Sequence, residues 1–514
     1  MLHNPLYRAT GKYIFFFLMT IAICRVTVDI FAAVIVIAGI MTAMANKPGR
    51  ALIFFLFLPF LGLINPLIFP RTLNYMIITR LGSVIMTLTL FMASQDRHGH
   101  ESLPLGLLGV YCVISIISSA DGYAPVISYL KLFSFVQFMI AIYVGTKNLH
   151  HYPKELFELR AAFFAFCCIV IFGSVLVLPF PSIAYYTSIS RMVNLEGMEE
   201  ALAAFQQHEG IKLFCGILNH SQTLSPVLSC CAGWVFADMV LVEGRLSKVH
   251  IALLAVTPFL AFMTRSRLAL LSYAVMFTMM AGYCFPRMKV NMRLRGHVRT
   301  FILMSLIALI LVLVVLQIRS QAFSRFIRKT EDVSGDQRTA MEAFTQTRMG
   351  AIENGLYDFR QNPLFGKGFQ VASYTGILYQ QGLNTWYSAP IEKSLLPMIV
   401  LGESGIVGSA VFILFLLSFY ATCARKRYHV TISLFTVFLA TNMGEGTFFA
   451  TNSVGGVMWI LTVVGGFLID LAAKGKIQIQ TLAPPPPPEL EVTVDSKTGR
   501  RRIEATTGPR RYGL

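Results

Sequence analysis

The chain has 514 residues, of which 55% are hydrophobic and only 13% are charged, and its mean hydropathy is +0.63. A soluble globular domain carries about 25% charged residues, so this composition excludes a single aqueous core and predicts an integral membrane protein. The net charge of +17 lies in short loops and the tail, where it indicates topology and contact with anionic lipids. The sequence contains no motif of aromatic and basic residues that is typical of RNA or DNA binding, so we do not expect nucleic acid to be a partner.

Apolar runs with the length of a spanning helix occupy most of the chain up to residue 473. They predict an all-α polytopic transmembrane bundle of about 12 to 14 spans. The first run is too long for one ordinary helix, so it is either one tilted helix or a tight hairpin. Arg25 and Asp29 are four residues apart in it and can pair along one helix face. The candidate spans are residues 13–44, 51–69, 75–93, 104–118, 126–145, 160–180, 216–242, 248–263, 267–285, 298–318, 395–420, 428–443 and 453–473.

Basic loops predict the orientation. Residues 286–299 carry five arginines and lysines and no acid, Arg425, Lys426 and Arg427 follow a later span, and the tail is basic too. By the positive-inside rule these segments are cytoplasmic. Counting spans then groups the other loops: residues 95–103, 146–159 and 244–250 lie inside, and residues 181–215, 264–267 and 319–394 lie on the far side, the periplasm of a bacterial cell.

The large loop, residues 319–394, is the longest polar interruption of the transmembrane domain, residues 1–473. Apolar residues at helical spacing predict a helix that runs to about Gln361. The residue before Pro363 is pushed out of the helical region, which ends the helix there. Gly366 and Gly368 then permit a tight turn. We expect this helix to lie along the membrane surface or to cover a cavity.

The tail, residues 474–514, contains the five-proline run Pro484–Pro488 followed by a polar, charged stretch. This composition predicts a disordered cytoplasmic extension with a polyproline II piece. A passive tail is the favoured interpretation, and a docking segment for a partner is the alternative.

Two arginines and a serine form the first candidate site. Arg265 and Arg267 flank Ser266 at the mouth of a far-side helix hairpin. A lone boundary arginine normally snorkels to the interface. A pair shifts the interpretation toward phosphate binding, because guanidinium forks match phosphate oxygens. Arg348, on the predicted loop helix, would by itself be a solvated charge.

Two further residues are candidates for acid–base chemistry. Glu392 lies where the large loop re-enters the membrane, and a carboxylate placed there can act as a general base. The alternative is a surface pair with Lys393 that has no role. His220 lies in a polar group inside an apolar segment, where it should face a cavity or a neighbouring helix. It is either a ligand or base, or a packed hydrogen-bonding histidine.

The sequence motifs of several common kinds of enzyme are absent. There is no P-loop, no dinucleotide fingerprint, no G-x-S-x-G and no H-E-x-x-H. The nine cysteines lie in or beside apolar runs, and no pair has metal-ligand spacing. We interpret them as small buried hydrophobic residues. We therefore expect neither a metal nor a cofactor.

Three ordered motifs carry a resemblance to a known family. They are Thr264–Ala269; Arg348 followed by Asn362–Phe369; and Glu392–Leu395 followed by Leu401–Gly408. Together with Gly216–Pro226, they resemble the O-antigen ligase and Wzy-type polysaccharide polymerase superfamily of bacterial inner-membrane proteins. The resemblance covers roughly residues 210–470.

The resemblance implies a mechanism. An acceptor hydroxyl attacks the anomeric carbon of a glycan carried on undecaprenyl diphosphate, and lipid diphosphate leaves. Arg267 and Arg348, supported by Arg265, would neutralise the diphosphate without a metal. Ligases of this family typically place a histidine at the position of Glu392. This departure favours a polymerase of exopolysaccharide or O-antigen with Glu392 as the base, and His220 is the reserve candidate.

Other functions remain open at this stage. The nearest alternative is an O-antigen ligase that transfers glycan to lipid A-core. A transporter or flippase of a lipid-linked glycan should show inverted repeats, and none is found. A scaffold recruited through the proline run is a third alternative. The expected partners are the lipid-linked glycan and membrane lipids, with a chain-length regulator protein as a further candidate.

Overall fold

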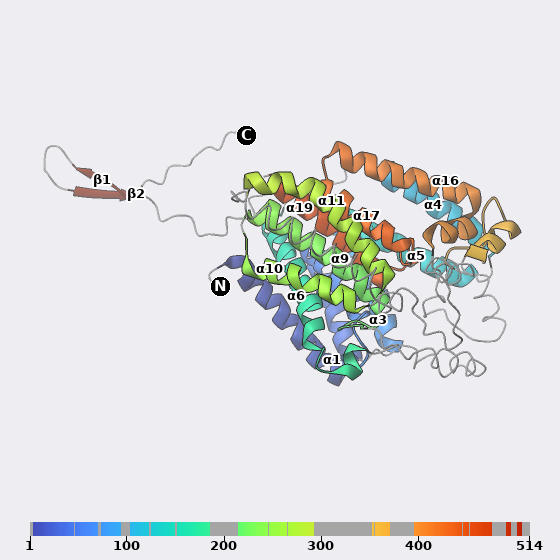
Figure 1. The fold of residues 1–514 in the computed structure, drawn as a ribbon, viewed down its shortest axis with the longest axis horizontal. Helices are drawn as coiled ribbons and strands as arrows, with labels where there is room; N and C mark the ends of the chain where they lie inside the picture. Colours follow the sequence, from blue (N-terminus) through green and yellow to red (C-terminus); the bar gives the residue numbers. More distant parts are fainter. Residues whose placement is uncertain are drawn as a thin grey trace, which may run out of the picture.

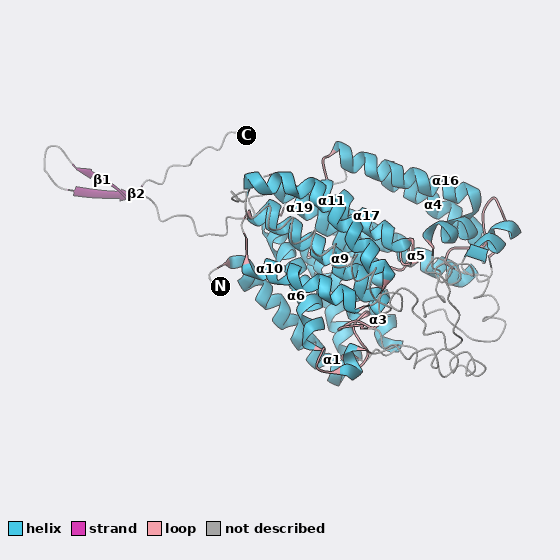
Figure 2. Ribbon diagram, in the orientation of Figure 1, coloured by secondary structure: helices cyan, strands magenta, loops and turns pink. Residues whose placement is uncertain are grey.

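The computed structural model describes residues 4–45, 47–69, 73–93, 103–122, 125–149, 152–185, 214–244, 246–264, 266–291, 352–353, 355–370, 395–444, 446–451, 453–474, 490–494 and 501–505. The described residues up to 474 form a bundle of helices (Figures 1 and 2). Seven of the described helices are long and apolar enough to cross a membrane, and six shorter apolar helices accompany them. The protein is therefore an all-α, multi-pass membrane protein, as the composition predicted, and the total of 12 to 14 spans stays a prediction.

The helices follow the predicted spans closely. In chain order they are α1 (Pro5–Met44), α2 (Pro48–Leu61), α3 (Leu73–Ala93), α4 (Leu103–Ala120), α5 (Pro125–Leu149), α6 (Pro153–Leu176), α7 (Pro181–Ala184), α9 (Ser221–Ala237), the π-helix η2 (Asp238–Glu243), α10 (Lys248–Met263), α11 (Arg267–Asn291), α16 (Leu396–Arg425), α17 (His429–Asn442), α18 (Val454–Trp459), the π-helix η3 (Ile460–Val464) and α19 (Gly465–Ala473). Prolines occupy the first or second position of α1, α2, α6 and α16. At these positions a backbone N–H would have no partner within the helix, so proline, which lacks the N–H, costs no hydrogen bond. The predicted span over residues 298–318 lies outside the described residues.

The first apolar run is a hairpin of two helical halves. Phe17 lies against Phe57 of α2, with ring centroids 5.8 Å apart. A side chain at Gly39 would lie 3.7 Å from Phe54 of the same helix. A straight helix would separate positions 17 and 39 by about 33 Å, whereas positions 54 and 57 are less than one turn apart, about 5 Å. The chain must therefore double back, and it does so at Thr27, whose backbone is non-helical (φ −144°, ψ 54°).

The helix termini gather at two ends of the bundle. At the first, the tail end, the N–H of Gly49 donates to Glu155 Oε2 over 2.7 Å, and Lys474 donates to the carbonyl of Lys426. At the second, the loop end, the N–H of Asn65 donates to the carbonyl of Ile217 over 2.9 Å.

The tail end holds the α5–α6, η2–α10 and α16–α17 connections and the end of α19. The loop end holds the α4–α5 and α10–α11 turns, the start of α9 and residues 362–370. This grouping agrees with the predicted sides of the loops. The compartment that each end faces stays a prediction.

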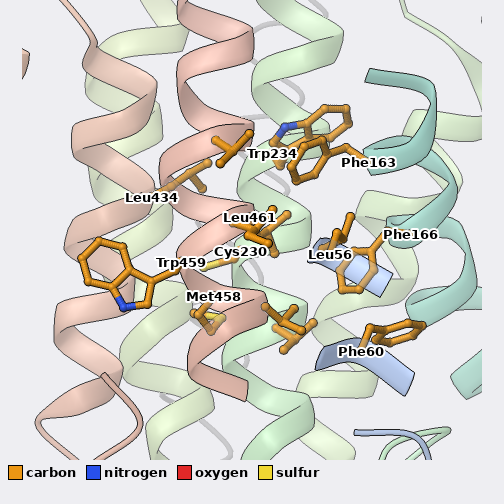
Figure 3. Packing of buried hydrophobic residues seen from close by; sticks show 14 of the residues in the cluster. Leu56, Phe60, Phe163, Phe166, Cys230, Trp234, Leu434, Met458, Trp459 and Leu461 are labelled. Carbon is orange, nitrogen blue, oxygen red and sulfur yellow. The ribbon is translucent and has the colours of Figure 1, made fainter. Parts of the chain in front are cut away.

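Aromatic and sulfur-containing side chains fill the centre of the bundle. Trp234 of α9 stacks on Phe163 of α6, with ring centroids 5.8 Å apart, and both belong to the cluster drawn in Figure 3. Its indole N–H donates to the carbonyl of Gly465 over 3.2 Å, which joins α9 to α19. Eight of the nine cysteines have a described environment, and all eight are buried and free, as expected for small hydrophobic residues.

Part of the tail has secondary structure that the sequence analysis did not predict. β1 (Leu490–Val494) and β2 (Arg501–Ala505) pair antiparallel, with Val492 opposite Ile503. These are the strands that the described residues contain, apart from one isolated bridge between Ile64 and Leu218. The proline run lies outside the described residues.

Candidate functional site

A break in α16 is the centre of the candidate site. Gly405 has φ 62° and ψ −163°, so the helix is interrupted after two and a half turns. An interruption leaves backbone N–H and C=O groups without helical partners. In a membrane protein such groups must find partners within the protein.

Residues 362–370, here called the motif segment, supply those partners. Four backbone hydrogen bonds join the two segments: Lys367 N–H to Gly402 O (3.0 Å), Gly368 N–H to Glu403 O (3.2 Å), Ile406 N–H to Pro363 O (2.9 Å) and Val407 N–H to Leu364 O (3.2 Å). The first two satisfy carbonyls that end the first half of α16, and the last two satisfy amides that begin its second half. The two segments, which the sequence analysis placed in separate motifs, therefore form one structural unit.

Glycines make this close approach possible. A Cβ at Gly366 would overlap the backbone of Glu403, and a Cβ at Gly405 would overlap the backbone of Leu364. Both glycines also have positive φ values, 75° and 62°, which L-residues with a side chain rarely adopt. The expected helix end is confirmed as well: the chain is helical up to Gln361 and turns directly after it.

Serines at the α4–α5 turn hold the motif segment on its other side. Ser118 accepts a hydrogen bond from Gly368 N–H over 2.8 Å and donates a short one to the carbonyl of Glu403. Ser119 accepts from Phe369 N–H over 3.1 Å, and Ser128 donates to the carbonyl of Phe369 over 2.8 Å. The sequence analysis did not single out these serines. Their position at the ends of two apolar spans was the available signal.

Two buried carboxylates adjoin this unit. Glu403, beside the break, is 3% exposed, and Asp358, on the helical residues before the motif segment, is 6% exposed. The Cβ of Asp358 lies 3.3 Å from the position that a side chain at Gly402 would take. An ionisable residue inside a membrane span is a functional candidate by default. The sequence analysis quoted Glu403 within a motif but named neither residue as a site residue.

Aromatic rings pack around Phe369 near the end of the motif segment. Phe369 lies between Phe135 of α5 and Phe449 in the α17–α18 connection, with ring centroids 5.9 and 5.1 Å away. Tyr111 of α4 stacks on Phe449 at 5.7 Å. The unit is thus packed against α4, α5 and the α17–α18 connection together.

His220 occupies the N-cap of α9. Its Nδ1 accepts a hydrogen bond from Gln222 N–H over 3.1 Å. A ring nitrogen that accepts must carry a lone pair, so in a neutral imidazole the proton is on Nε2. In this arrangement Nε2 is a donor, which suits a hydrogen bond to a ligand oxygen better than proton abstraction.

The α10–α11 turn lies beside the start of α9. Ser266, between the two predicted phosphate-binding arginines, is within 3.4 Å of Ser225 Oγ to Oγ. Thr264 accepts from Ser266 N–H over 3.3 Å and shapes the turn. Ser225 is five residues after His220, about one and a half helical turns. The structure therefore brings the polar group around His220 together with the Thr264–Arg267 turn.

The remaining predicted site residues lie outside the described residues. These are Arg265, Arg348 and Glu392, and for Arg267 only the backbone, at the start of α11, is described. Thr264 and Ser266, the sequence neighbours of Arg265, lie at the loop end. Leu395, three residues after Glu392 in the sequence, is the N-cap of α16.

Within the part of the chain that the structure describes, no group of three histidine, cysteine, aspartate or glutamate side chains is placed to hold a metal ion. No protein-family model matches the chain, and neither a curated protein nor a solved structure matches it.

Proposed function

We propose that this chain is a membrane glycosyltransferase that polymerises oligosaccharide repeat units carried on undecaprenyl diphosphate. The observation that supports this most directly is the unit formed by the motif segment and the break in α16. Four backbone hydrogen bonds hold it together, it lies at the loop end, and the chain continues from it into the segment that carries Glu392. The backbone of Arg267, at the start of α11, lies at the same end.

The chemistry would divide between these groups. Glu392 takes the proton from the acceptor hydroxyl, whose oxygen forms a bond to the anomeric carbon of the lipid-linked glycan. The bond between that carbon and the diphosphate oxygen breaks, and the electron pair leaves with the lipid diphosphate. Arg265, Arg267 and Arg348 offset the charge that develops on the diphosphate.

The proposed setting is the bacterial inner membrane, with the loop end toward the periplasm and the tail in the cytoplasm. The positive-inside pattern supports this orientation. A carboxylate at the re-entry position, where ligases typically have histidine, favours polymerisation over transfer to lipid A-core.

Gel profiling of surface polysaccharide from a deletion strain tests the proposal. The strain is complemented with the wild type, Arg267→Ala, Arg348→Ala or Glu392→Ala, and expression of each is checked. We expect the deletion to leave only single repeat units and the three variants to fail to restore polymer. Arg8→Ala and Glu353→Ala are matched controls, because both side chains are exposed, and both should restore polymer fully.

Other outcomes would identify a different function. Long lipid-linked polymer that accumulates without reaching its acceptor would indicate a ligase. Full rescue by all three site variants would contradict the site and favour a transporter or a scaffold.

A further inference from the structure

Helices α11 and α17 meet at the tail end of the bundle through two aromatic rings. Tyr283 lies near the end of α11 and His429 begins α17, and their ring centroids are 4.5 Å apart. Arg287 follows Tyr283 by one turn, and its guanidinium carbon lies 3.9 Å from the centre of the tyrosine ring. The same guanidinium donates to the carbonyl of Tyr283 over 3.2 Å. Arg287 is therefore held beside the start of α17.

The turn between α16 and α17 adds three exposed cations, at residues 425–427. Tyr428 N–H donates to the carbonyl of Cys423 over 2.8 Å, and Arg427 N–H donates to the carbonyl of Ala424 over 3.0 Å. This pattern ends a helix with one left-handed residue, which is usually glycine. Here that residue is Arg427, with φ 54°. The chain keeps a cationic side chain at a conformational cost, which indicates a role for the side chain.

The end of α19 fixes the height of this turn. Lys474 donates to the carbonyl of Lys426, and its Nζ lies 3.9 Å from the centre of the Tyr428 ring. Half-buried tyrosines in contact with cations are typical of the membrane–water interface, where lipid phosphates lie. The exposed arginines of this surface, here called the arginine group, are Arg287, Arg425 and Arg427.

Carboxylates do not neutralise the arginine group. Within the part of the chain that the structure describes, none of its members forms an ion pair with an acidic side chain. Asp470 of α19 is 1% exposed and accepts hydrogen bonds from the N–H groups of Val430 and Thr431, over 3.1 and 2.9 Å. Its charge is thus directed at the start of α17. The surface outside it is positive and suits an anion.

An apolar surface leads away from the arginine group along α16. Leu414 and Leu417 are 51% and 60% exposed. Leu414 is eleven residues before Arg425, about three turns, so the two lie on the same face of the helix. In a bilayer these leucines face hydrocarbon. An anion that carries an acyl chain can therefore contact both the cations and the leucines, whereas a soluble anion contacts the cations alone.

We propose that the arginine group binds the phosphate of an anionic phospholipid in the leaflet at the tail end. Guanidinium forks match phosphate oxygens and form charge-assisted hydrogen bonds with them. The contact with Tyr283 orients Arg287 before the lipid arrives. This site is independent of the proposed glycosyltransferase function. Free inorganic phosphate is the other source of the same chemistry.

Binding of phosphatidylglycerol to the full-length protein in a nonionic detergent tests the site. Native mass spectrometry compares the wild type with a triple variant in which each member of the arginine group is replaced by glutamine. We expect the triple variant to bind at least about tenfold more weakly. The matched control replaces three exposed cations elsewhere at the tail end by glutamine, namely Arg8, Lys12 and Lys154. It should bind like the wild type, and an equal loss in both variants would overturn the site.

Arg427→Gly separates binding from folding. It removes the side chain and its conformational cost together, so the unfolding temperature should stay the same or rise while the affinity falls several-fold. Arg427→Lys should lie between this variant and the wild type in affinity. Wild-type affinity in Arg427→Gly would overturn the assignment of Arg427, and wild-type affinity in a folded triple variant would overturn the site.

Two further titrations identify the source of the phosphate. Phosphatidylcholine, whose headgroup has no net charge, should bind weakly and equally to the wild type and the triple variant. An excess of inorganic phosphate at matched ionic strength should not displace phosphatidylglycerol. Displacement by inorganic phosphate would overturn the assignment to a lipid. Polymer yield is not the readout in any of these measurements, so a failure of the proposed function leaves their outcome unchanged.

Discussion

The two ends of the bundle satisfy their buried polar groups in different ways. At the tail end, Arg160 of α6 donates two hydrogen bonds to Asp238, of 2.7 and 3.0 Å, and a third to Glu243 of 2.7 Å. Nε2 of His250, on α10, lies 3.1 Å from Asp238 Oδ2, one of the two oxygens that Arg160 binds. These side chains are 10% exposed or less. The buried charged side chains at this end are therefore paired with one another within the protein.

The π-helix η2 explains how one guanidinium meets two carboxylates. Asp238 and Glu243 are five residues apart, and in an α-helix they would point about 140° apart. The wider i→i+5 winding brings residues five apart onto one face. Arg160 therefore binds both residues from a single direction.

At the loop end the polar groups are arranged differently. Backbone groups at the break in α16 are satisfied by the motif segment, and the buried side chains of Glu403 and Asp358 adjoin this unit. We infer that the closed ionic network at the tail end stabilises the fold, whereas the interlocked backbone at the loop end shapes the proposed site. Substitutions at the two ends should therefore have different consequences.

The largest expected effect is at the tail end. Arg160→Met removes one partner of a buried network and leaves two carboxylates without their cation, which should lower the free energy of unfolding by about 3 to 5 kcal/mol. Reversible unfolding of the purified protein in mixed micelles measures this. Binding of undecaprenyl diphosphate by the folded fraction should not change.

Arg50→Met is the matched control. Arg50 also pairs with α6, through Glu158 at 2.8 Å, but its side chain is 41% exposed. An exposed pair contributes about 0 to 1 kcal/mol. Equal losses for Arg50 and Arg160 would contradict the view that burial distinguishes the two pairs.

The second effect tests the break in α16. Gly405→Ala forces a side chain against the backbone of Leu364 at a positive φ, which should cost about 2 to 4 kcal/mol and loosen the motif segment. Hydrogen exchange of the amides of residues 366–369 should rise. Gly109→Ala is the control, since a Cβ there meets nothing within 4 Å. Unchanged exchange in Gly405→Ala would show that the glycine is not needed for the interlocked unit.

The sequence predicted the spans and the end of the loop helix because hydropathy and proline act locally. It did not predict that Lys367 and Gly402 would pair, or that Arg160 and Asp238 would, because such pairs are 35 and 78 residues apart in the chain. Hydropathy shows that a segment crosses the membrane and does not show which helix lies beside it. The glycines of both motifs could be seen in the sequence. The reason for them, a close approach of two backbone segments, could be recognised only in the folded structure.

The serines that hold the motif segment (Ser118, Ser119 and Ser128), here called the serine clamp, should contribute less to the free energy of unfolding than Gly405 does. Ser118→Ala removes a group that bonds both Gly368 and Glu403, so we expect a loss of about 1 to 3 kcal/mol in unfolding free energy. Polymer yield should fall as well, because the motif segment is held less firmly. Ser418→Ala, whose hydroxyl bonds only the carbonyl of Phe415 within its own helix, should change neither quantity. A stable Ser118→Ala protein with normal polymer would contradict the clamp.

The smallest expected effect separates two roles of His220. As an N-cap, His220 is replaceable by asparagine, which also accepts from the N–H two residues later, whereas His220→Ala should cost about 1 kcal/mol. As the catalytic base it is not replaceable by asparagine, which cannot take up a proton at neutral pH. With Glu392 as the base, His220→Asn should therefore keep near-normal stability and produce polymer. Loss of polymer in a stable His220→Asn protein would instead move the proton transfer from Glu392 to the start of α9, next to the arginines of the α10–α11 turn.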